Sequence, residues 1–416
     1  MKPRIIVLFW ISILFCSPVF SKALTLGQCI DIAIEHNNTL KQGQISVDQS
    51  IISTKQTYSN LYPSISLSTS ENSQNTNISG NNWDSRFNLS AGVRQNIYTP
   101  GLYSELKLAQ INENASRLTQ VNLSAQIRST VEITYYNILT SMELLNVYRE
   151  NIHSAEQDLD RIRQMYKIGI RTESDVLKAE VQKGDFESTL LSEETNLTSL
   201  KRQLNLLMGS PSSTDLTLTT IDANSIAIPT IETAKSALLK NNPGYLAMQQ
   251  NRKANLMNLK IAREAYLPTV SASYSYSKAE NYIGGDIVGS NSIGISASIG
   301  LFDGFQKTQT IQKSKLNVKS AEIQLDENAQ ELLSELLGYY ADIDYYNRTI
   351  KLQAKNLELA QKDYELVSKQ YEMGLSTILD QTNAQLSVLK SQSSLVKAKY
   401  SRKIIESQIL RLLNTN

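Results

Sequence analysis

Two aspartates stand at matching places in the sequence and are its best candidates for charge chemistry. Asp175 follows Gly169 by six residues, and Asp380 follows Gly374 by the same six residues. A carboxylate at such a place can attract cations, or it can stabilise the first turn of a helix through the helix dipole. The residues alone leave both interpretations open.

The other reactive side chains are isolated. His36 and His153 have no acidic or cysteine neighbours at the spacing of metal ligands, so the sequence predicts no metal site. It contains no nucleophile motif, phosphate-binding loop or cofactor fingerprint. The formal net charge of +1 gives no indication of nucleic acid as a partner. The sequence therefore predicts a protein that is not an enzyme and that needs no cofactor.

Each aspartate lies in one copy of a duplicated unit. Tyr166–Glu180 (YKIGIRTESDVLKAE) matches Tyr371–Gln385 (YEMGLSTILDQTNAQ) at a shift of roughly 205 positions. The same shift relates Pro63 to Pro268, so chance is a poor explanation. We expect a first structural repeat at 24–209, a linker at 210–229 and a second repeat at 230–416.

The N-terminus has the layout of a Sec signal peptide. Basic residues precede an apolar run, Ile5–Phe15, and a small-residue cleavage site ends at Ala23. The run has about 11 residues, fewer than the ~20 that a spanning helix needs. An N-terminal anchor and lipidation at Cys16 are the weaker alternatives. We expect residues 1–23 to be removed on export.

After position 23 no run of 18 or more apolar residues occurs, so the mature chain is predicted to lack a spanning helix. A chain without such a helix can cross a bilayer only as a closed β-barrel, because lipid cannot satisfy open strand edges. Cleavage would leave one cysteine, Cys29, and no disulfide framework, which suits a bacterial envelope.

Long helices dominate both repeats. Leu102–Lys167 contains neither Gly nor Pro, and a helix of about 66 residues would be ~100 Å long. Apolar residues in its second half are spaced three and four apart, and the second copy repeats the pattern. We therefore expect coiled-coil hairpins at about 102–208 and 306–414, turning at Gly169 and Gly374. The heptad positions in the first repeat are Leu145, Tyr148, Ile152, Ala155, Leu159, Ile162 and Tyr166.

Between the helices the apolar period changes to two. Ile293 and Ile295, for example, alternate with small or polar residues, and each such segment is long enough to cross a bilayer when tilted. A half-buried sheet in a soluble domain is the alternative. Four strands cannot close a barrel, because the smallest have about eight, so the chain must oligomerise. The expected strands are about 63–75, 85–98, 268–280 and 292–302.

The order and duplication of these features resemble the TolC-type outer-membrane efflux family. The resemblance covers Leu24 to Asn414 and includes Pro63 and Pro268 at the helix-to-strand junctions and the two Y-x-x-G-x-x-x-x-x-D tips. The family has an aromatic residue followed by Asp-Gly-Gly after its strands. Leu301–Phe305 (LFDGF) keeps most of that motif.

The resemblance implies a membrane α/β-barrel fold: a homotrimer whose shared twelve-stranded outer-membrane β-barrel is continued by a periplasmic α-helical coiled-coil tunnel. It places the protein in the outer membrane of a Gram-negative bacterium, in contact with lipid and with a long periplasmic portion. It implies a passive exit duct for a tripartite efflux pump or type I secretion system. The partners would be a periplasmic adaptor (membrane fusion protein) and an inner-membrane pump or ABC transporter. The alternative is a soluble periplasmic coiled-coil spacer or adaptor protein.

The resemblance also implies where the mechanism lies. A carboxylate repeated by threefold symmetry around a narrow entrance forms an anionic ring that favours cations, and Asp380 is the first candidate. The family often has an acid where Asn383 stands and a basic residue where Ser376 stands. The expected entrance residues are Asp380, Asn383, Asp175, Arg171 and Ser376. The expected adaptor-docking tips are Ile168, Gly169, Ile170, Met373, Gly374 and Leu375.

Overall fold

The computed structural model describes residues 23–75, 83–220, 227–280 and 286–414. The predicted signal peptide lies almost entirely outside these residues. The chain forms two compact units, which we call the hairpin unit and the sheet unit. Within the described part of the chain, the hairpin unit comprises 23–37, 131–220 and 353–400, and the sheet unit comprises 38–75, 83–130, 227–280, 286–352 and 401–414.

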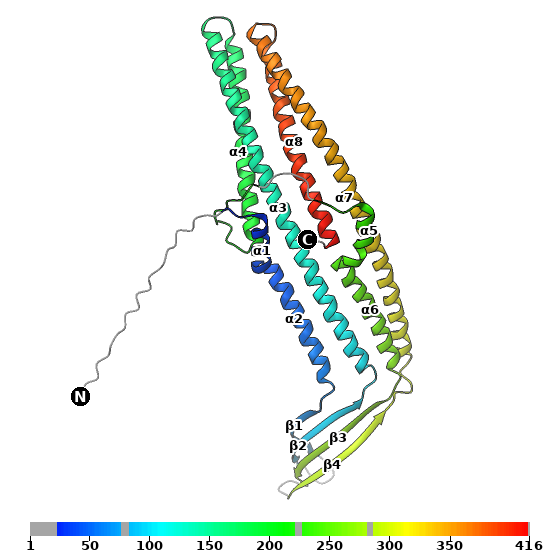
Figure 1. Ribbon diagram of the computed structural model, residues 1–416. Helices are drawn as coiled ribbons and strands as arrows, with labels where there is room; N and C mark the ends of the chain where they lie inside the picture. The colour runs from blue at the N-terminus through cyan, green and yellow to red at the C-terminus, as the bar shows by residue number, and fades with distance from the viewer. Residues whose placement is uncertain (1–22, 76–82, 221–226, 281–285, 415–416) are drawn as a thin grey trace, which may run out of the picture. The chain divides into compact units, whose positions relative to one another are not determined.

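The sheet unit contains a four-stranded antiparallel sheet in the order β1-β2-β3-β4 (Figure 1). Strands from the two repeats pair in its middle, where β2 meets β3. The strands are β1 (Ser64–Asn75), β2 (Trp83–Tyr98), β3 (Thr269–Glu280) and β4 (Ile287–Ser298).

The fourth strand begins and ends earlier than the expected 292–302. Its alternating pattern continues through Ile299 and Leu301, but pairing with β3 stops at Thr269↔Ser298. Pro268 precedes Thr269 and has no backbone N–H to donate, so the ladder cannot extend further. The alternating pattern of apolar side chains therefore extends beyond the residues that pair as a strand.

The two faces of the sheet differ in polarity. Serine hydroxyls meet across the strands on one face, at 2.7 Å between Ser68 and Ser90 and 2.9 Å between Ser277 and Ser290. Ser90 is also paired with Ser277, so this row of serines crosses all four strands. The other face is apolar and uncovered: Ile293 and Ile295 are 85% and 74% exposed.

Helices of both repeats continue from the sheet within the sheet unit. They are α2 (Asn38–Ser59), α5 (Ile231–Asn241), α6 (Pro243–Glu264) and parts of α3 (Leu102–Lys167), α7 (Gln306–Glu372) and α8 (Ile378–Leu413). Helices α5, α7 and α8 share an apolar core of Ala234, Leu238, Leu336, Ile409, Leu412 and Leu413. None of the helices in the described residues is long and apolar enough to cross a lipid bilayer.

The hairpin unit contains two antiparallel helical hairpins. The first consists of the second half of α3 and α4 (Glu173–Leu207), and the second of the end of α7 and the start of α8. Leu159, Ile162, Ala179, Tyr371 and Ile378 form the core near the turns. The heptad prediction fails at Tyr166, which is 44% exposed, whereas its counterpart Tyr371 is 2% exposed and belongs to the core.

The start of the inter-repeat linker is anchored in the hairpin unit, beside α1 (Leu26–His36). Leu216 and Leu218 are buried, and Leu218 forms a parallel bridge with Leu24. The hydroxyl of Tyr135 on α3 donates to the carbonyl oxygen of Thr219 at 2.6 Å. These contacts hold the two ends of the first repeat together.

Candidate functional site

The turns of the two hairpins have the same backbone structure. Gly169 and Gly374 have φ of 79° and 81°, a left-handed conformation that favours glycine. The N–H of Ile170 donates to the carbonyl of Met165 at 2.9 Å, and that of Leu375 to Gln370 at 2.8 Å, so both helices end in a Schellman motif. The duplication is therefore precise at the level of hydrogen bonds.

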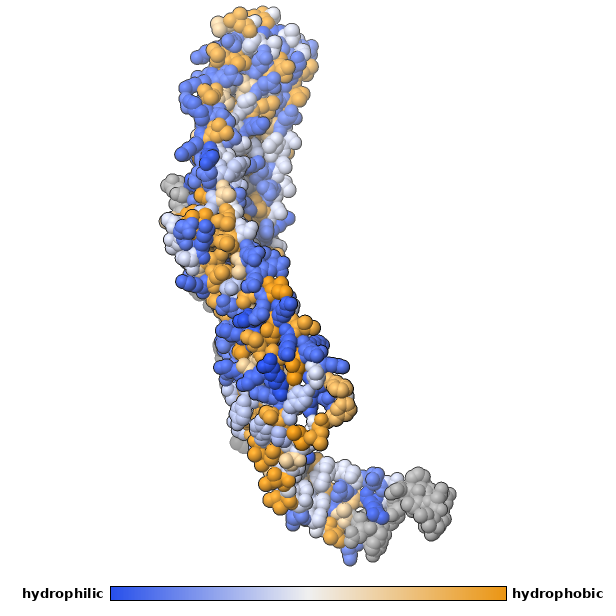
Figure 2. All heavy atoms as spheres, turned by 90° about the vertical axis from the view of Figure 1, so that its right-hand side faces the viewer, coloured by the Kyte–Doolittle hydropathy of each residue, from blue (hydrophilic) through white to orange (hydrophobic). Residues whose placement is uncertain are grey.

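The predicted docking residues around these glycines lie at the surface. Ile168, Ile170, Met373 and Leu375 are all exposed, and hydrophobic residues reach the surface at the tips, at the top of Figure 2. Exposure of apolar side chains to water is energetically unfavourable, so an exposed cluster of this kind beside a turn indicates a surface that a partner covers.

Both candidate aspartates cap a helix. The Asp175 backbone N–H donates to Oγ1 of Thr172, and the Thr172 N–H donates back to the Asp175 carboxylate, both at 3.3 Å. Asp380 makes the same box with Thr377, at 3.2 Å and 2.9 Å. The signal in the sequence is Thr-x-x-Asp after each turn, a variant of the capping box.

Asp380 has one contact that Asp175 lacks. The hydroxyl of Thr377 donates to Oδ2 of Asp380 at 2.6 Å, in addition to the Thr377 N–H. These two hydrogen bonds lower the pKa of Asp380 below its ordinary value. The side chain therefore keeps its negative charge into acidic solution, while it also stabilises the first turn of α8.

Arg171 fastens the first turn to the second hairpin. Its guanidinium carbon lies 3.9 Å from the centroid of the Tyr371 ring, within cation–π range. One of its terminal nitrogens donates to the Tyr371 carbonyl oxygen. Among the predicted entrance residues, Arg171 is the one that bridges the two hairpins within a single chain.

Ser376 and Asn383 do not join this contact. The Ser376 hydroxyl donates to the carbonyl of Val367 at 3.1 Å, within the second hairpin. Asn383 is exposed on α8, and its carbonyl accepts from the Ser387 hydroxyl at 2.9 Å. Arg171 therefore contacts the second tip, whereas the hydrogen bonds of Ser376 and Asn383 described above lie within their own hairpin.

A second link between the hairpins was not predicted. Asp158 on α3 is only 7% exposed, and its carboxylate accepts a hydrogen bond from the hydroxyl of Tyr364 on α7. Arg161 lies 3.3 Å from Asp158 and 2.6 Å from Glu372 of α7. Burial is the main influence on Asp158 and raises the pKa of its carboxyl group.

The sequence does contain a signal for Asp158. It lies three residues after Ala155 and four before Ile162, two predicted heptad positions, so it shares their buried side of the helix. Facing it, α4 and α8 contribute three largely buried glutamines, Gln182, Gln381 and Gln385. A charged residue among coiled-coil core positions favours specificity of pairing over stability.

An apolar groove lies between the first turns of α4 and α8, with a volume of about 390 Å³. Leu177, Val181 and Leu379 line it, and all three are exposed. Its lining begins five residues after Gly169 and four residues after Gly374, so the groove lies at the start of the helices that follow the two turns.

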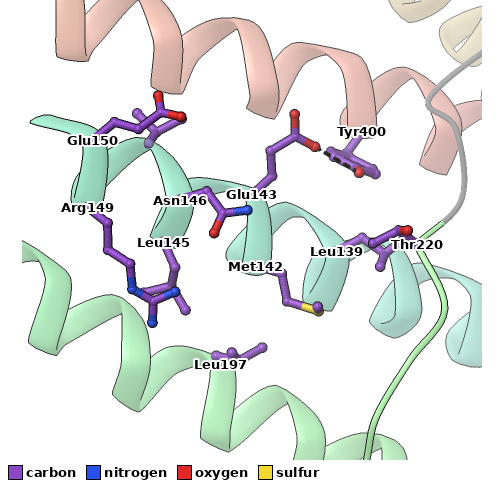
Figure 3. Close-up of a pocket in the computed structure, with 11 residues that line it drawn as sticks. Leu139, Met142, Glu143, Leu145, Asn146, Arg149, Glu150, Leu197, Thr220 and Tyr400 are labelled. Carbon is purple, nitrogen blue, oxygen red and sulfur yellow. Dashed lines mark hydrogen bonds between the residues drawn. The ribbon is translucent and has the colours of Figure 1, made fainter. Parts of the chain in front are cut away.

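A larger hollow of about 520 Å³ lies further along the hairpin unit, between α3, α4 and α8 (Figure 3). Its lining mixes apolar and charged side chains from these helices. Glu143 accepts a hydrogen bond from the Tyr400 hydroxyl at 3.1 Å, so one of its acids is engaged in packing α3 against α8. Nowhere in the described residues do three or more His, Cys, Asp or Glu side chains gather to hold a metal ion.

Comparison with known proteins gives one consistent result. The family model described as "Outer membrane efflux protein" matches residues 29–210 and 235–415. The outer membrane protein TolC of Escherichia coli (strain K12) is 20% identical over 331 residues, which cover 75% of this chain and 66% of TolC. Protein CyaE of Bordetella pertussis is 24% identical over 341 residues, covering 77% of this chain and 69% of CyaE.

Solved structures share the fold at low sequence identity. A CusC structure superposes with a TM-score of 0.84 at 17% identity, over 93% of this chain and 91% of that chain. VceC of Vibrio cholerae gives a TM-score of 0.80 at 16% identity, over 93% and 95%. The similarity therefore extends across both repeats.

Proposed function

The chain belongs to the outer membrane efflux protein family, and from that premise we propose that three copies form the passive exit duct of a tripartite efflux pump or type I secretion system. The observation that carries the proposal is the sheet, with one exposed apolar face and a serine row on the other. A sheet in lipid around water needs this division of polarity.

Family membership confirms several predictions. The resemblance and the outer-membrane location are confirmed, as is the fold class, a duplicated repeat of the kind found in trimeric outer-membrane channels. The general function, a duct for efflux or secretion, is confirmed as well, and the soluble spacer is not favoured. The partners, a periplasmic adaptor and an inner-membrane pump or ABC transporter, belong to the proposal.

The edges of the sheet require more than one copy of the chain, and the family resemblance implies three. In one chain β1 and β4 are the outer strands, each with one unpaired side. Unpaired backbone groups are very unfavourable in lipid, and a barrel needs at least about eight strands. Three copies of a four-stranded sheet supply twelve, and the β4 edge of one copy would pair with β1 of the next.

The hairpin tips are the proposed docking site for a periplasmic adaptor that connects the duct to an inner-membrane pump or ABC transporter. Support comes from the exposed apolar residues at both turns and from the adjoining groove at Leu177 and Leu379. In this proposal the chain performs no catalysis. Energy and cargo selection would come from the pump.

We propose that Asp380, with Asn383 one turn further on, lines the closed entrance, where three copies of the carboxylate would form an anionic ring. Capping does not exclude this role, because the carboxylate remains charged and at the surface. Because Ser376 stands where the family often has a basic residue, Arg171 would hold the entrance closed instead, since it contacts Tyr371 across the hairpins. We call this contact the latch. Asp175 would stabilise the first turn of α4 through its capping box.

The experiment is conductance in planar bilayers with the purified full-length mature protein. Trimers are expected to give channels, whereas a protein that stays monomeric and soluble without detergent would refute the duct. Ile295→Lys should destabilise the membrane form by ~2–4 kcal/mol near mid-membrane. Ser292→Lys, on the serine face of the same strand, is the matched control and should be tolerated.

A further inference from the structure

One backbone feature at the end of the sheet is unfavourable for its residue type. Phe305 has φ of 69°, the left-handed conformation that glycine adopts easily and a bulky aromatic residue adopts rarely. Gly304 before it has φ of 67°. Two successive left-handed residues suit the Gly-Gly of the family motif, so this chain keeps the turn while placing a phenyl ring on it.

The ring that this strain positions is not in the protein core. Leu301, Phe302 and Phe305 are 90%, 77% and 65% exposed. The two phenyl rings pack edge to face, with centroids 5.5 Å apart and planes at 87°. This preassembled apolar pair is exposed and follows β4 within a few residues.

Polar groups hold the turn and border the pair. The Lys307 N–H donates to the Asp303 carboxylate at 3.0 Å, which caps the start of α7. The Lys307 ammonium group donates to the Gly300 carbonyl at 3.1 Å and lies 5.3 Å from the centroid of the Tyr266 ring. Apolar rings next to a flexible cation and a tyrosine suit the boundary between lipid chains and headgroups.

We propose that the segment Leu301–Phe305 is a membrane-interface anchor, whose two phenyl rings insert into the outer membrane at its periplasmic headgroup boundary. The partner is the lipid surface. The uncovered apolar face of the adjoining strand β4 continues toward this segment, so one continuous apolar surface would meet the lipid. The inference rests on the proposed placement of the sheet in the bilayer.

Depth-dependent quenching tests the anchor in trimers of the full mature chain, reconstituted into vesicles with lipids brominated at different depths. Trp83→Phe provides the background, so that a single introduced tryptophan reports. Phe302→Trp and Phe305→Trp should be quenched most by bromines near the headgroups. Ile295→Trp should be quenched by deeper bromines, and Tyr345→Trp, an exposed position on α7, should not be quenched.

The outcomes separate the two proposals. Quenching at position 295 without quenching at 302 and 305 would overturn the anchor alone and indicate that a neighbouring copy covers the rings. Absence of quenching at all three positions would overturn the placement of the sheet in lipid as well.

Substitution by glycine gives an independent test. Phe305→Gly removes the ring and also the backbone strain, whereas Phe305→Ala removes the ring and keeps the strain. Phe305→Gly should unfold in detergent at the same or a higher temperature than the unsubstituted protein, yet a smaller fraction should fold into vesicles. Equal folding into vesicles by Phe305→Gly and the unsubstituted protein would contradict the anchor.

Discussion

The guanidinium of Arg171 stacks on the ring of Tyr371 at 3.9 Å and donates to its carbonyl oxygen, so the turn of the first hairpin is bound to the last residues of α7. The Nε of Arg171 and the hydroxyl of Tyr371 are buried and have no partner in the described part of the chain. The contact therefore depends on the aromatic face and the backbone.

Removing the latch should loosen the entrance. A cation–π contact contributes about 0.5–2 kcal/mol, and a hydrogen bond from a charged donor about 1.5–3 kcal/mol. Arg171→Ala is therefore expected to raise the leak conductance of single channels. Arg171→Lys should have a smaller effect, because it keeps the positive charge although it loses the planar guanidinium group. Arg163→Ala is the control, since Arg163 pairs at 2.6 Å with Glu180 inside the first hairpin. Equal leak in Arg171→Ala and the control would argue against the latch.

Tyr371 should tolerate loss of its hydroxyl. Tyr371→Phe keeps the ring and the backbone carbonyl that Arg171 contacts, and it removes a buried unpaired hydroxyl. We expect unchanged leak and an equal or higher unfolding temperature. Tyr371→Ala removes a core side chain that is 2% exposed and should cost about 3–5 kcal/mol. If Tyr371→Phe leaked like Tyr371→Ala, the hydroxyl itself would contribute to keeping the entrance closed.

Asp380 combines a cap with a charge, and a conservative substitution separates them. Asp380→Asn keeps an oxygen that can accept from Thr377 and removes the charge. We expect reduced cation selectivity and little change in thermal stability, whereas Asp380→Ala should lose both. Asp175→Asn is the matched control in the first hairpin. Unchanged single-channel currents at several salt concentrations would restrict Asp380 to capping.

Packing of the two hairpins should weaken as pH rises. Burial raises the pKa of Asp158, so the closed packing favours its protonated form. The stabilisation is present at acidic pH and is lost as pH rises through that raised pKa. The facing groups are Arg161 on α3, Tyr364 and Glu372 on α7, and neutral glutamines on α4 and α8.

Hydrogen exchange of the hairpin unit, followed from acidic to neutral pH, measures this dependence. Asp158→Asn should flatten it, because the side chain then carries no charge at any pH. Asp160→Asn, at an exposed position on the same helix, should leave it unchanged. The same pH profile in Asp158→Asn and the unsubstituted protein would assign the dependence to another group.

The apolar tips should be needed for assembly and not for conduction. Ile170→Asp and Leu375→Asp place a charge where an adaptor would cover apolar surface. We expect loss of adaptor capture from membranes, with single-channel conductance unchanged in purified trimers. Leu206→Asp, exposed on α4 outside the tip, controls for surface charge. Normal capture with both tip variants would move the docking site elsewhere.

Periodicity made much of the fold predictable. Apolar spacings of two, and of three and four, recur after roughly 205 positions and indicate strands, hairpins and turns, because these patterns depend only on local backbone geometry. Predictions failed where the local pattern met a tertiary limit. The fourth strand ends at Ser298, where its pairing with β3 stops, and Tyr166 is exposed although its counterpart Tyr371 is buried in the core.

By itself the sequence determined that the first helix of each hairpin ends at a glycine and that a capped helix follows, since both features arise within a few residues. Only the tertiary structure decided that Arg171 meets Tyr371 and that Asp158 meets Tyr364, contacts between residues 200 and 206 positions apart. Such pairs depend on how one hairpin rotates and slides against the other. That arrangement is set by the packing of many apolar side chains at once, and no short stretch of sequence encodes it.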